Sequence, residues 1–188
     1  LVAHDAIGIV DEVYIEFRPD WRNETVLKFS RNMVVTSSLT KVFGLGELRA
    51  GWIVGPPSLV DICRNCWNNM AVNSSTMGLL ATRALIPHLD DWYRADMAVL
   101  HRNRQIFMDW AKRNGLGYVP NEYSPIILLE LPKGTDDKEL AKRIFDEFGL
   151  FLVPASYFGL KGFLRIGIHK SEENLINGLG ILERVLNS

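Results

Sequence analysis

The segment SSLTKVFGLGELRAGW, residues Ser37–Trp52, decides how this chain is interpreted. It places Lys41 after a Ser-Leu-Thr run and Arg49 eight residues later, with three glycines nearby. The segment is not a Walker-type phosphate loop, because its lysine precedes the glycines instead of following them. The glycines also lack the Gly-x-Gly-x-x-Gly spacing of dinucleotide-binding proteins. A lone lysine is usually a solvated surface charge, so the role of Lys41 depends on the sequence around it.

Three short apolar runs on either side of Lys41 predict strands. Residues 6–10 (AIGIV) are typical of a buried parallel strand and run directly into Asp11. Residues 33–36 (MVVT) predict a second strand, and residues 50–54 (AGWIV) predict a third strand ended by a Gly-Pro-Pro turn. These runs indicate part of an α/β layer.

Helical patterns dominate the middle of the chain. Cys63 and Cys66 have CxxC spacing, but without a second pair we expect two small core residues on a helix. The four histidines are scattered, and we assign no metal site. We expect one helix to start at Ser58 and a second at Ser74 or Ser75, and we expect Pro87 to break the second. A third helix should start at Asp90 or Asp91 and run to about Arg113.

The last part of the sequence predicts a compact α+β unit. Thr135 and Asp136 start a helix with Phe145 and Phe148 facing inward, and Gly149 stops it. Strands are expected at residues 126–131, 150–154 and 163–168, and a last helix capped by Ser171. We therefore predict three parts: residues 1–73 in the α/β layer, residues 74–113 as connecting helices, and residues 114–188 as the α+β domain.

Composition excludes several classes of function. With 21 basic and 22 acidic residues and a formal net charge of −1, the chain has no electrostatic signature of a nucleic-acid-binding or membrane-surface protein. It has no long apolar run, no secretory signal and no disulfide framework. We therefore expect a cytoplasmic protein without nucleic-acid or membrane partners. The sequence opens at Leu1, just before a strand, which indicates a part of something longer.

The blocks around Lys41 resemble those of the class I/II aminotransferases, enzymes of fold type I that depend on pyridoxal 5'-phosphate (PLP). Their lysine motif is roughly Ser-[Leu/Phe]-[Ser/Thr]-Lys followed by Gly-Leu-x-Gly-x-Arg-x-Gly, and residues 38–51 match it in register, except that the usual Pro-Gly pair is Gly46-Glu47. DEVY lies thirty residues before the lysine, and LVPASYFG and LRIGI lie near the C-terminus, with Ala155 where glycine is usual. The match runs the full length of the chain in the correct order.

The resemblance implies a role for each matching residue at a cofactor site. Lys41 would hold PLP covalently and shuttle the α-proton, because only lysine supplies the amine. Asp11 would keep the pyridine nitrogen protonated, and Tyr14 would hydrogen-bond the phenolic oxygen of PLP. Ser38 and Arg49 would hold the phosphate.

The resemblance also implies a substrate residue. Arg165 would bind the α-carboxylate of the substrate in a bidentate pair. Each residue also has a structural interpretation: Asp11 as the cap of a turn, Arg49 as a surface ion-pair residue, and Arg165 in a structural pair within its strand.

The resemblance implies a partial PLP-transferase fold of type I: an incomplete large-domain sheet, a long connecting helix and a small α+β C-terminal domain. The family's N-terminal half supplies a phosphate-binding turn, a ring stacked on the pyridine and an asparagine, and this chain holds none of them. The expected function is transfer of an amino group between an amino acid and a 2-oxo acid. We also expect a homodimer in the full-length form, and no activity from these 188 residues alone. Alternatives are another fold-type-I PLP enzyme (a lyase, decarboxylase or synthase) or a non-catalytic fragment or regulatory domain.

Overall fold

The computed structural model describes residues 6–71 and 74–187. Contacts divide the chain into two compact units, residues 1–96 and residues 97–188, and helix α3 contributes to both. The predicted boundary between residues 73 and 74 adjoins residues 72–73, which lie outside the described residues, and the three-part division stays a prediction. The strands are β1 (Gly8–Asp11), β2 (Met33–Ser38), β3 (Gly51–Val54), β4 (Tyr118–Val119), β5 (Ile126–Glu130), β6 (Val153–Pro154) and β7 (Phe163–Gly167). The α-helices are α1 (Pro57–Met70), α2 (Thr76–Leu85), α3 (Leu89–Arg113), α4 (Asp137–Phe148) and α5 (Glu172–Leu186).

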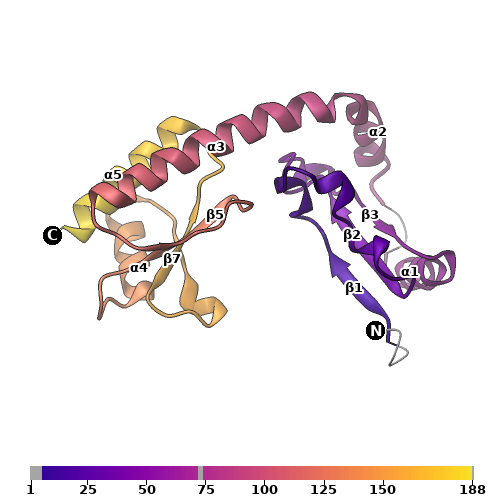
Figure 1. The fold of residues 1–188 in the computed structure, drawn as a ribbon, viewed down its shortest axis with the longest axis horizontal. Helices are drawn as coiled ribbons and strands as arrows, with labels where there is room; N and C mark the ends of the chain where they lie inside the picture. The colour runs from indigo at the N-terminus through magenta and orange to yellow at the C-terminus, as the bar shows by residue number, and fades with distance from the viewer. Residues whose placement is uncertain (1–5, 72–73, 188) are drawn as a thin grey trace. The chain divides into compact units, whose positions relative to one another are not determined.

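The first unit is built on a sheet in the order β1-β2-β3 (Figure 1). β1 and β2 are parallel, with Asp11 opposite Thr36, and β2 and β3 are antiparallel. Val34 and Val35 are both buried, so both faces of the central strand are covered. The expectation of a fully buried first strand was wrong, because Ile9 is 74% exposed. Among the described residues, β1 is an outer strand of this sheet, with β2 as its one strand neighbour.

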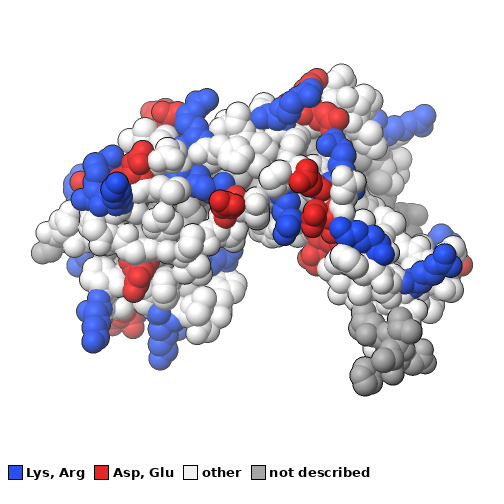
Figure 2. Space-filling model, viewed as in Figure 1, with Lys and Arg blue, Asp and Glu red and all other residues white. Residues whose placement is uncertain are grey.

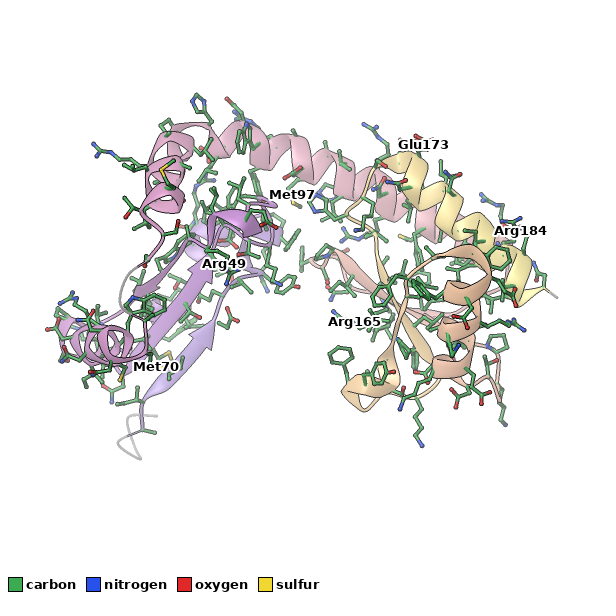
Figure 3. The ribbon with its side chains drawn as sticks, turned by 180° about the vertical axis from the view of Figure 1, so that it is seen from behind. Arg49, Met70, Met97, Arg165, Glu173 and Arg184 are labelled. Atoms are coloured by element: carbon green, nitrogen blue, oxygen red, sulfur yellow. The ribbon has the colours of Figure 1, made fainter. Side chains whose placement is uncertain are left out.

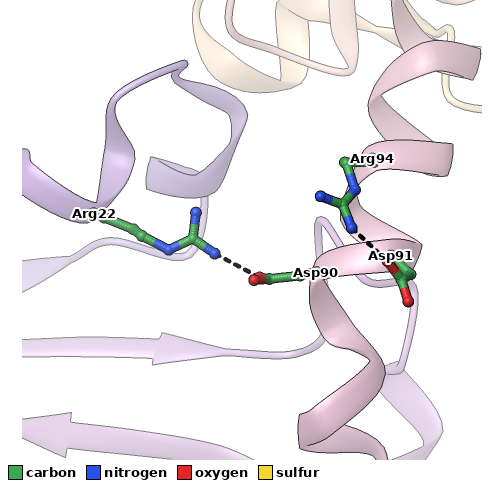
Figure 4. A network of polar contacts seen from close by, with 4 residues as sticks. All are labelled: Arg22, Asp90, Asp91 and Arg94. Atoms are coloured by element: carbon green, nitrogen blue, oxygen red, sulfur yellow. Dashed lines mark hydrogen bonds and ion pairs between the residues drawn. The ribbon is translucent and has the colours of Figure 1, made fainter.

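Three 3-10 helices cross from β1 to β2: η2 (Ile15–Phe17), η3 (Trp21–Asn23) and η4 (Val26–Lys28). Arg22 of η3 forms an ion pair with Asp90 in the first turn of α3, next to the Arg94–Asp91 pair within that helix (Figure 4). These pairs are exposed, so each contributes little to stability.

Most helix boundaries confirm the sequence signals. The Ser75 side chain accepts a hydrogen bond from the Gly78 amide at the start of α2, and Pro87 lies in a 3-10 turn between α2 and α3. The predicted Ser58 cap was wrong, since α1 begins at Pro57 and its N-cap is Pro56 without a side-chain bond. Proline fits this first turn because its missing N–H has no intrahelical partner there.

The second unit packs α3, α4 and α5 against a four-stranded antiparallel sheet in the order β4-β5-β7-β6 (Figure 1). Ile127 pairs with Ile166 and Leu129 with Leu164, so four buried side chains share one face of the sheet. Asn103 of α3 is fully buried, and its amide donates to the carbonyls of Ile168 and Lys170. These bonds tie the helix to the end of β7.

The predicted caps of the second unit are confirmed. The Asp136 carboxylate accepts from the Lys138 and Glu139 amides, and these two bonds lower its pKa. Gly149 ends α4 in the left-handed conformation, and Ser171 caps α5. Two expectations were wrong: Phe145 and Phe148 are exposed, and strand structure in residues 150–154 is limited to Val153–Pro154.

In neither described stretch does a helix combine the length and the apolar character that crossing a membrane requires. Basic and acidic side chains are interspersed over the face drawn in Figure 2, in keeping with the near-zero net charge.

Candidate functional site

The carboxyl ends of β1 and β2 lie together because the two strands are parallel, and the predicted lysine segment starts there. Ligand sites of α/β proteins form at this edge of a parallel sheet. The edge carries Asp11 at the end of β1, Ser38 at the end of β2, and Lys41 three residues further. The structure thus brings together residues from two of the sequence blocks.

The lysine segment is a closed loop held by buried apolar side chains. The Leu39 amide donates to the Ala50 carbonyl at 3.4 Å, and the Leu45 amide donates to the Leu39 carbonyl at 3.0 Å. Leu39, Val42 and Ala50 are buried, whereas Lys41, between the first two, is exposed. Packing of the apolar neighbours therefore fixes the backbone and leaves the amine accessible.

Tyr14 lies near the lysine amine. Lys41 Nζ lies 5.7 Å from the centroid of the Tyr14 ring. The ring in turn stacks on buried Phe17, with 5.7 Å between ring centroids and an interplanar angle of 29°. A phenol and an amine that are twenty-seven residues apart in the sequence therefore lie close together at this edge.

Asp11 is exposed, and its carboxylate shapes the turn that leads to Tyr14. Asp11 Oδ1 accepts from the Val13 amide at 3.1 Å and from Thr36 Oγ1 at 3.5 Å. Asp11 thus caps a turn through one of its two carboxylate oxygens. The same hydrogen bonds orient the carboxylate at the edge, so capping the turn is compatible with the expected role of Asp11 toward the cofactor.

Arg49 and Ser38 lie at the same end of the sheet, since Ser38 pairs with Gly51, two residues after Arg49. Ser38 Oγ accepts from the Thr40 amide at 3.3 Å. Arg49 has φ 51° and ψ 37°, and no other described residue apart from glycine has a positive φ. This left-handed conformation costs free energy and is found disproportionately at ligand sites. Figure 3 labels Arg49 within the first unit.

Arg165 belongs to the second unit, where it lies in the middle of β7 (Figure 3). Its guanidinium lies 4.5 Å from the centroid of the Phe158 ring, and the side chain is half-buried. A planar guanidinium stacked on an aromatic ring keeps its donor edge available for a carboxylate.

Two buried polar residues at this edge were not singled out from the sequence. Glu16 lies two residues after Tyr14, and Ser37 directly precedes Ser38. Burial raises the pKa of the Glu16 carboxyl, and the Ser37 hydroxyl, which donates to it, opposes that shift. The available signal was the interruption of an apolar pattern, because Ser37 lies between Val35 and Leu39 on one face of a strand.

The expectation that Cys63 and Cys66 are core residues was wrong, since Cys66 is exposed and Cys63 is only half-buried. Both are free thiols on α1, which buries none of its side chains fully. The helix therefore lies on the surface of the first unit.

An amine, a carboxylate, a phenol and a guanidinium lie at the edge of an α/β sheet, and a separate α+β unit follows in the chain. The fold matches that of a solved PLP-dependent aminotransferase from Streptococcus suis (TM-score 0.84, 18% identity, 97% of this chain and 57% of that chain). It also matches a double mutant of aspartate aminotransferase from Thermus thermophilus (TM-score 0.86, 22% identity, 98% of this chain and 50% of that chain).

Sequence comparison shows the family of the chain. The sequence model of the aminotransferase class I and II family matches residues 1–182, and the chain belongs to this family. It is 29% identical to histidinol-phosphate aminotransferase 2 of Haemophilus influenzae, over 92% of this chain and 46% of the relative. It is 30% identical to histidinol-phosphate aminotransferase 1 of Idiomarina loihiensis, over 89% of this chain and 45% of the relative. The chain thus spans about half the length of these relatives.

Proposed function

We propose that this chain is part of a PLP-dependent aminotransferase that moves an amino group between an amino acid and a 2-oxo acid. The observation that carries the proposal is the 5.7 Å approach of Lys41 Nζ to the Tyr14 ring at the β1–β2 edge, in a chain of the aminotransferase class I and II family. The alternative of a non-catalytic domain has no comparable observation in its favour.

The residues of the edge fit PLP by their chemistry. PLP carries an aldehyde, a phenolic oxygen, a pyridine nitrogen and a phosphate, and each has a complementary group here. The exposed amine of Lys41 suits the aldehyde, and the Tyr14 hydroxyl suits the phenolic oxygen. The Asp11 carboxylate suits the protonated pyridine nitrogen, and Ser38 and Arg49 suit the phosphate.

When bound, PLP supplies an electron sink for the bond that breaks at the α-carbon of the substrate. Lys41 Nζ would hold the cofactor and would move the α-proton of the substrate. Asp11 would hold the protonated pyridine nitrogen, and Tyr14 would donate a hydrogen bond to the phenolic oxygen. In this proposal Arg165 binds the substrate carboxylate through its two guanidinium donors.

Several finer features belong to the same proposal. We infer a homodimer for the full-length protein, a cytoplasmic location, a biosynthetic role, and no nucleic-acid or membrane partner. The near-zero net charge supports the last of these. Because the chain spans about half the length of its curated relatives, we expect no activity from the 188 residues alone.

A half-reaction tests this function. The PLP-loaded chain is incubated with amino acids or with histidinol phosphate, alone and together with the N-terminal half of the Haemophilus influenzae relative. We expect the two halves together to form pyridoxamine phosphate in proportion to the protein, and a 2-oxo acid to convert it back to PLP. Steady release of ammonia or carbon dioxide without pyridoxamine phosphate would indicate a lyase or decarboxylase and overturn the proposal. Lys41→Ala is the control.

A further inference from the structure

A buried polar pair lies directly beneath the edge that carries Tyr14 and Lys41. Glu16 in η2 is 3% exposed and Ser37 in β2 is 6% exposed. Ser37 Oγ donates a hydrogen bond to Glu16 Oε1 at 3.3 Å, which links two segments that are twenty-one residues apart. A carboxylate is rarely buried without a specific partner, because burial disfavours its charged form.

The pair is one of the hydrogen-bonded tethers that hold the turn bearing Tyr14. Before Tyr14, the Glu12 amide donates to the Thr36 carbonyl at 2.8 Å. After Tyr14, Glu16 accepts the Ser37 hydroxyl. Both tethers end on β2, just ahead of Ser38 and the loop with Lys41. Tyr14 is therefore held on both sides by the strand that leads to the lysine.

The exposed residues of the edge depend on these buried neighbours for their position. The Tyr14 ring stacks on buried Phe17, the residue after Glu16, and Lys41 Nζ lies 5.7 Å from the centroid of the Tyr14 ring. The hydrogen bond between Glu16 and Ser37 thus connects the segment that contains Tyr14 and Phe17 to the strand that leads to Lys41. An exposed side chain holds a defined geometry when packing and hydrogen bonds beneath it fix its backbone.

We propose that Glu16 and Ser37 are positioning residues, whose hydrogen bond fixes Tyr14 relative to Ser38 and Lys41 and so sets how tightly the edge binds PLP. They act through Tyr14 and Lys41 and have no contact with the cofactor. This inference rests on the proposed PLP site. Loss of the bond leaves a buried acceptor or donor without its partner, which is costly in a medium of low polarity.

The surroundings of the pair permit a sharp set of variants. Glu16 and Ser37 line a hollow of about 230 Å³, together with Trp21, Trp52 and Val54. This space accommodates the amide of Glu16→Gln and the extra methyl group of Ser37→Thr, and both variants keep the hydrogen bond. Ser37→Ala and Glu16→Ala remove it. Val34→Ala is the matched control, because Val34 is equally buried in β2 and takes no part in the bond.

The experiment measures the dissociation constant of PLP and the visible circular dichroism of the bound cofactor in the full 188-residue chain. We expect Ser37→Ala and Glu16→Ala to weaken PLP binding by about tenfold, the effect of one buried hydrogen bond. They should also change the sign or intensity of the dichroic band. Ser37→Thr and Glu16→Gln should stay within about twofold of the parent, and Val34→Ala should leave the band unchanged.

The outcomes separate this inference from the function on which it rests. A parent chain that binds no PLP at Lys41, either alone or together with the N-terminal half of the Haemophilus influenzae relative, overturns both. A parent chain that binds PLP, with Ser37→Ala and Glu16→Ala binding as tightly, overturns the positioning role alone. The same follows if Val34→Ala weakens binding and alters the band as much as Ser37→Ala does.

Discussion

Substituting Gly78 by alanine tests how the loop with Arg49 is supported. Gly78 is buried in the first turn of α2, and a Cβ built there would lie 2.2 Å from the carbonyl oxygen of Leu48, the residue before Arg49. Gly180 in α5 is the matched control, because a Cβ there meets nothing within 4 Å. Both substitutions replace a helical glycine, so their backbone effects are alike.

The two variants should change stability in opposite directions. Alanine in place of a helical glycine contributes about 0.5–1 kcal/mol to the free energy of unfolding, and Gly180→Ala should show this gain. At Gly78 the gain is outweighed, because the new methyl group must displace a backbone carbonyl rather than a flexible side chain. Overpacking of this kind costs about 1–3 kcal/mol, so we expect a net loss of roughly 1–2 kcal/mol for Gly78→Ala.

Urea unfolding measures the free energy of unfolding of each variant. Hydrogen exchange with mass spectrometry measures the protection of each unit separately. Gly78→Ala should reduce protection in η5 (Gly46–Leu48) and around Arg49, and Gly180→Ala should leave these peptides unchanged. A Gly78→Ala chain as stable as the parent, with unchanged exchange around Arg49, would refute the reasoning that α2 supports this loop.

Three further predictions concern buried or capping polar groups. Asn103→Ala removes both amide bonds to the carbonyls of Ile168 and Lys170, so the second unit should lose about 2–4 kcal/mol in urea unfolding. An effect below about 0.5 kcal/mol would contradict the role of this link. Burial raises the pKa of Glu16, next to Glu12, Arg22 and Tyr93, so the folded state binds the proton more tightly. The stability that Glu16 contributes is therefore present at low pH and lost as pH rises from the ordinary carboxyl pKa to the raised one. Stability measured from pH 4 to 7 should show Glu16→Gln gaining on the parent as pH rises, and a parallel pair of curves would count against this. The pKa of Asp136 is lowered by its two cap bonds, so its contribution is present near neutral pH and lost as pH falls through the lowered pKa. Thermal melts of Asp136→Ala should therefore differ from the parent at pH 7 and converge with it in acid, while Asp136→Asn, which keeps an acceptor, should differ less.

The elements with local chemical signals could be predicted from the sequence. Ser75, Asp136 and Ser171 cap helices through their own side chains, and Gly149 ends α4 because its left-handed conformation suits glycine. The three strands around the lysine segment were predicted from apolar runs alone. Ser58 failed as a cap because Pro56 and Pro57 set the start of α1 one residue earlier.

The features that depend on tertiary packing could not be predicted. Phe145 and Phe148 have helical spacing with Ile144, but only Ile144 lies on the buried side of α4. The sequence places Asp11, Tyr14 and Lys41 in order, yet the stacking of Tyr14 on Phe17 and the bond between Glu16 and Ser37 depend on the path of three 3-10 helices. A polar stretch carries no periodic signal for such a path.

The most direct test of the central claim is peptide mapping after incubation with PLP and reduction with borohydride, which makes a lysine-bound cofactor permanent. Lys41→Ala removes the proposed amine, and Lys28→Ala is the matched control, since Lys28 is also an exposed lysine of the first unit with its amine near an aromatic ring. We predict one adduct, on Lys41, that is lost in Lys41→Ala and retained in Lys28→Ala. Labelling scattered over several lysines, or unchanged in Lys41→Ala, would contradict the account.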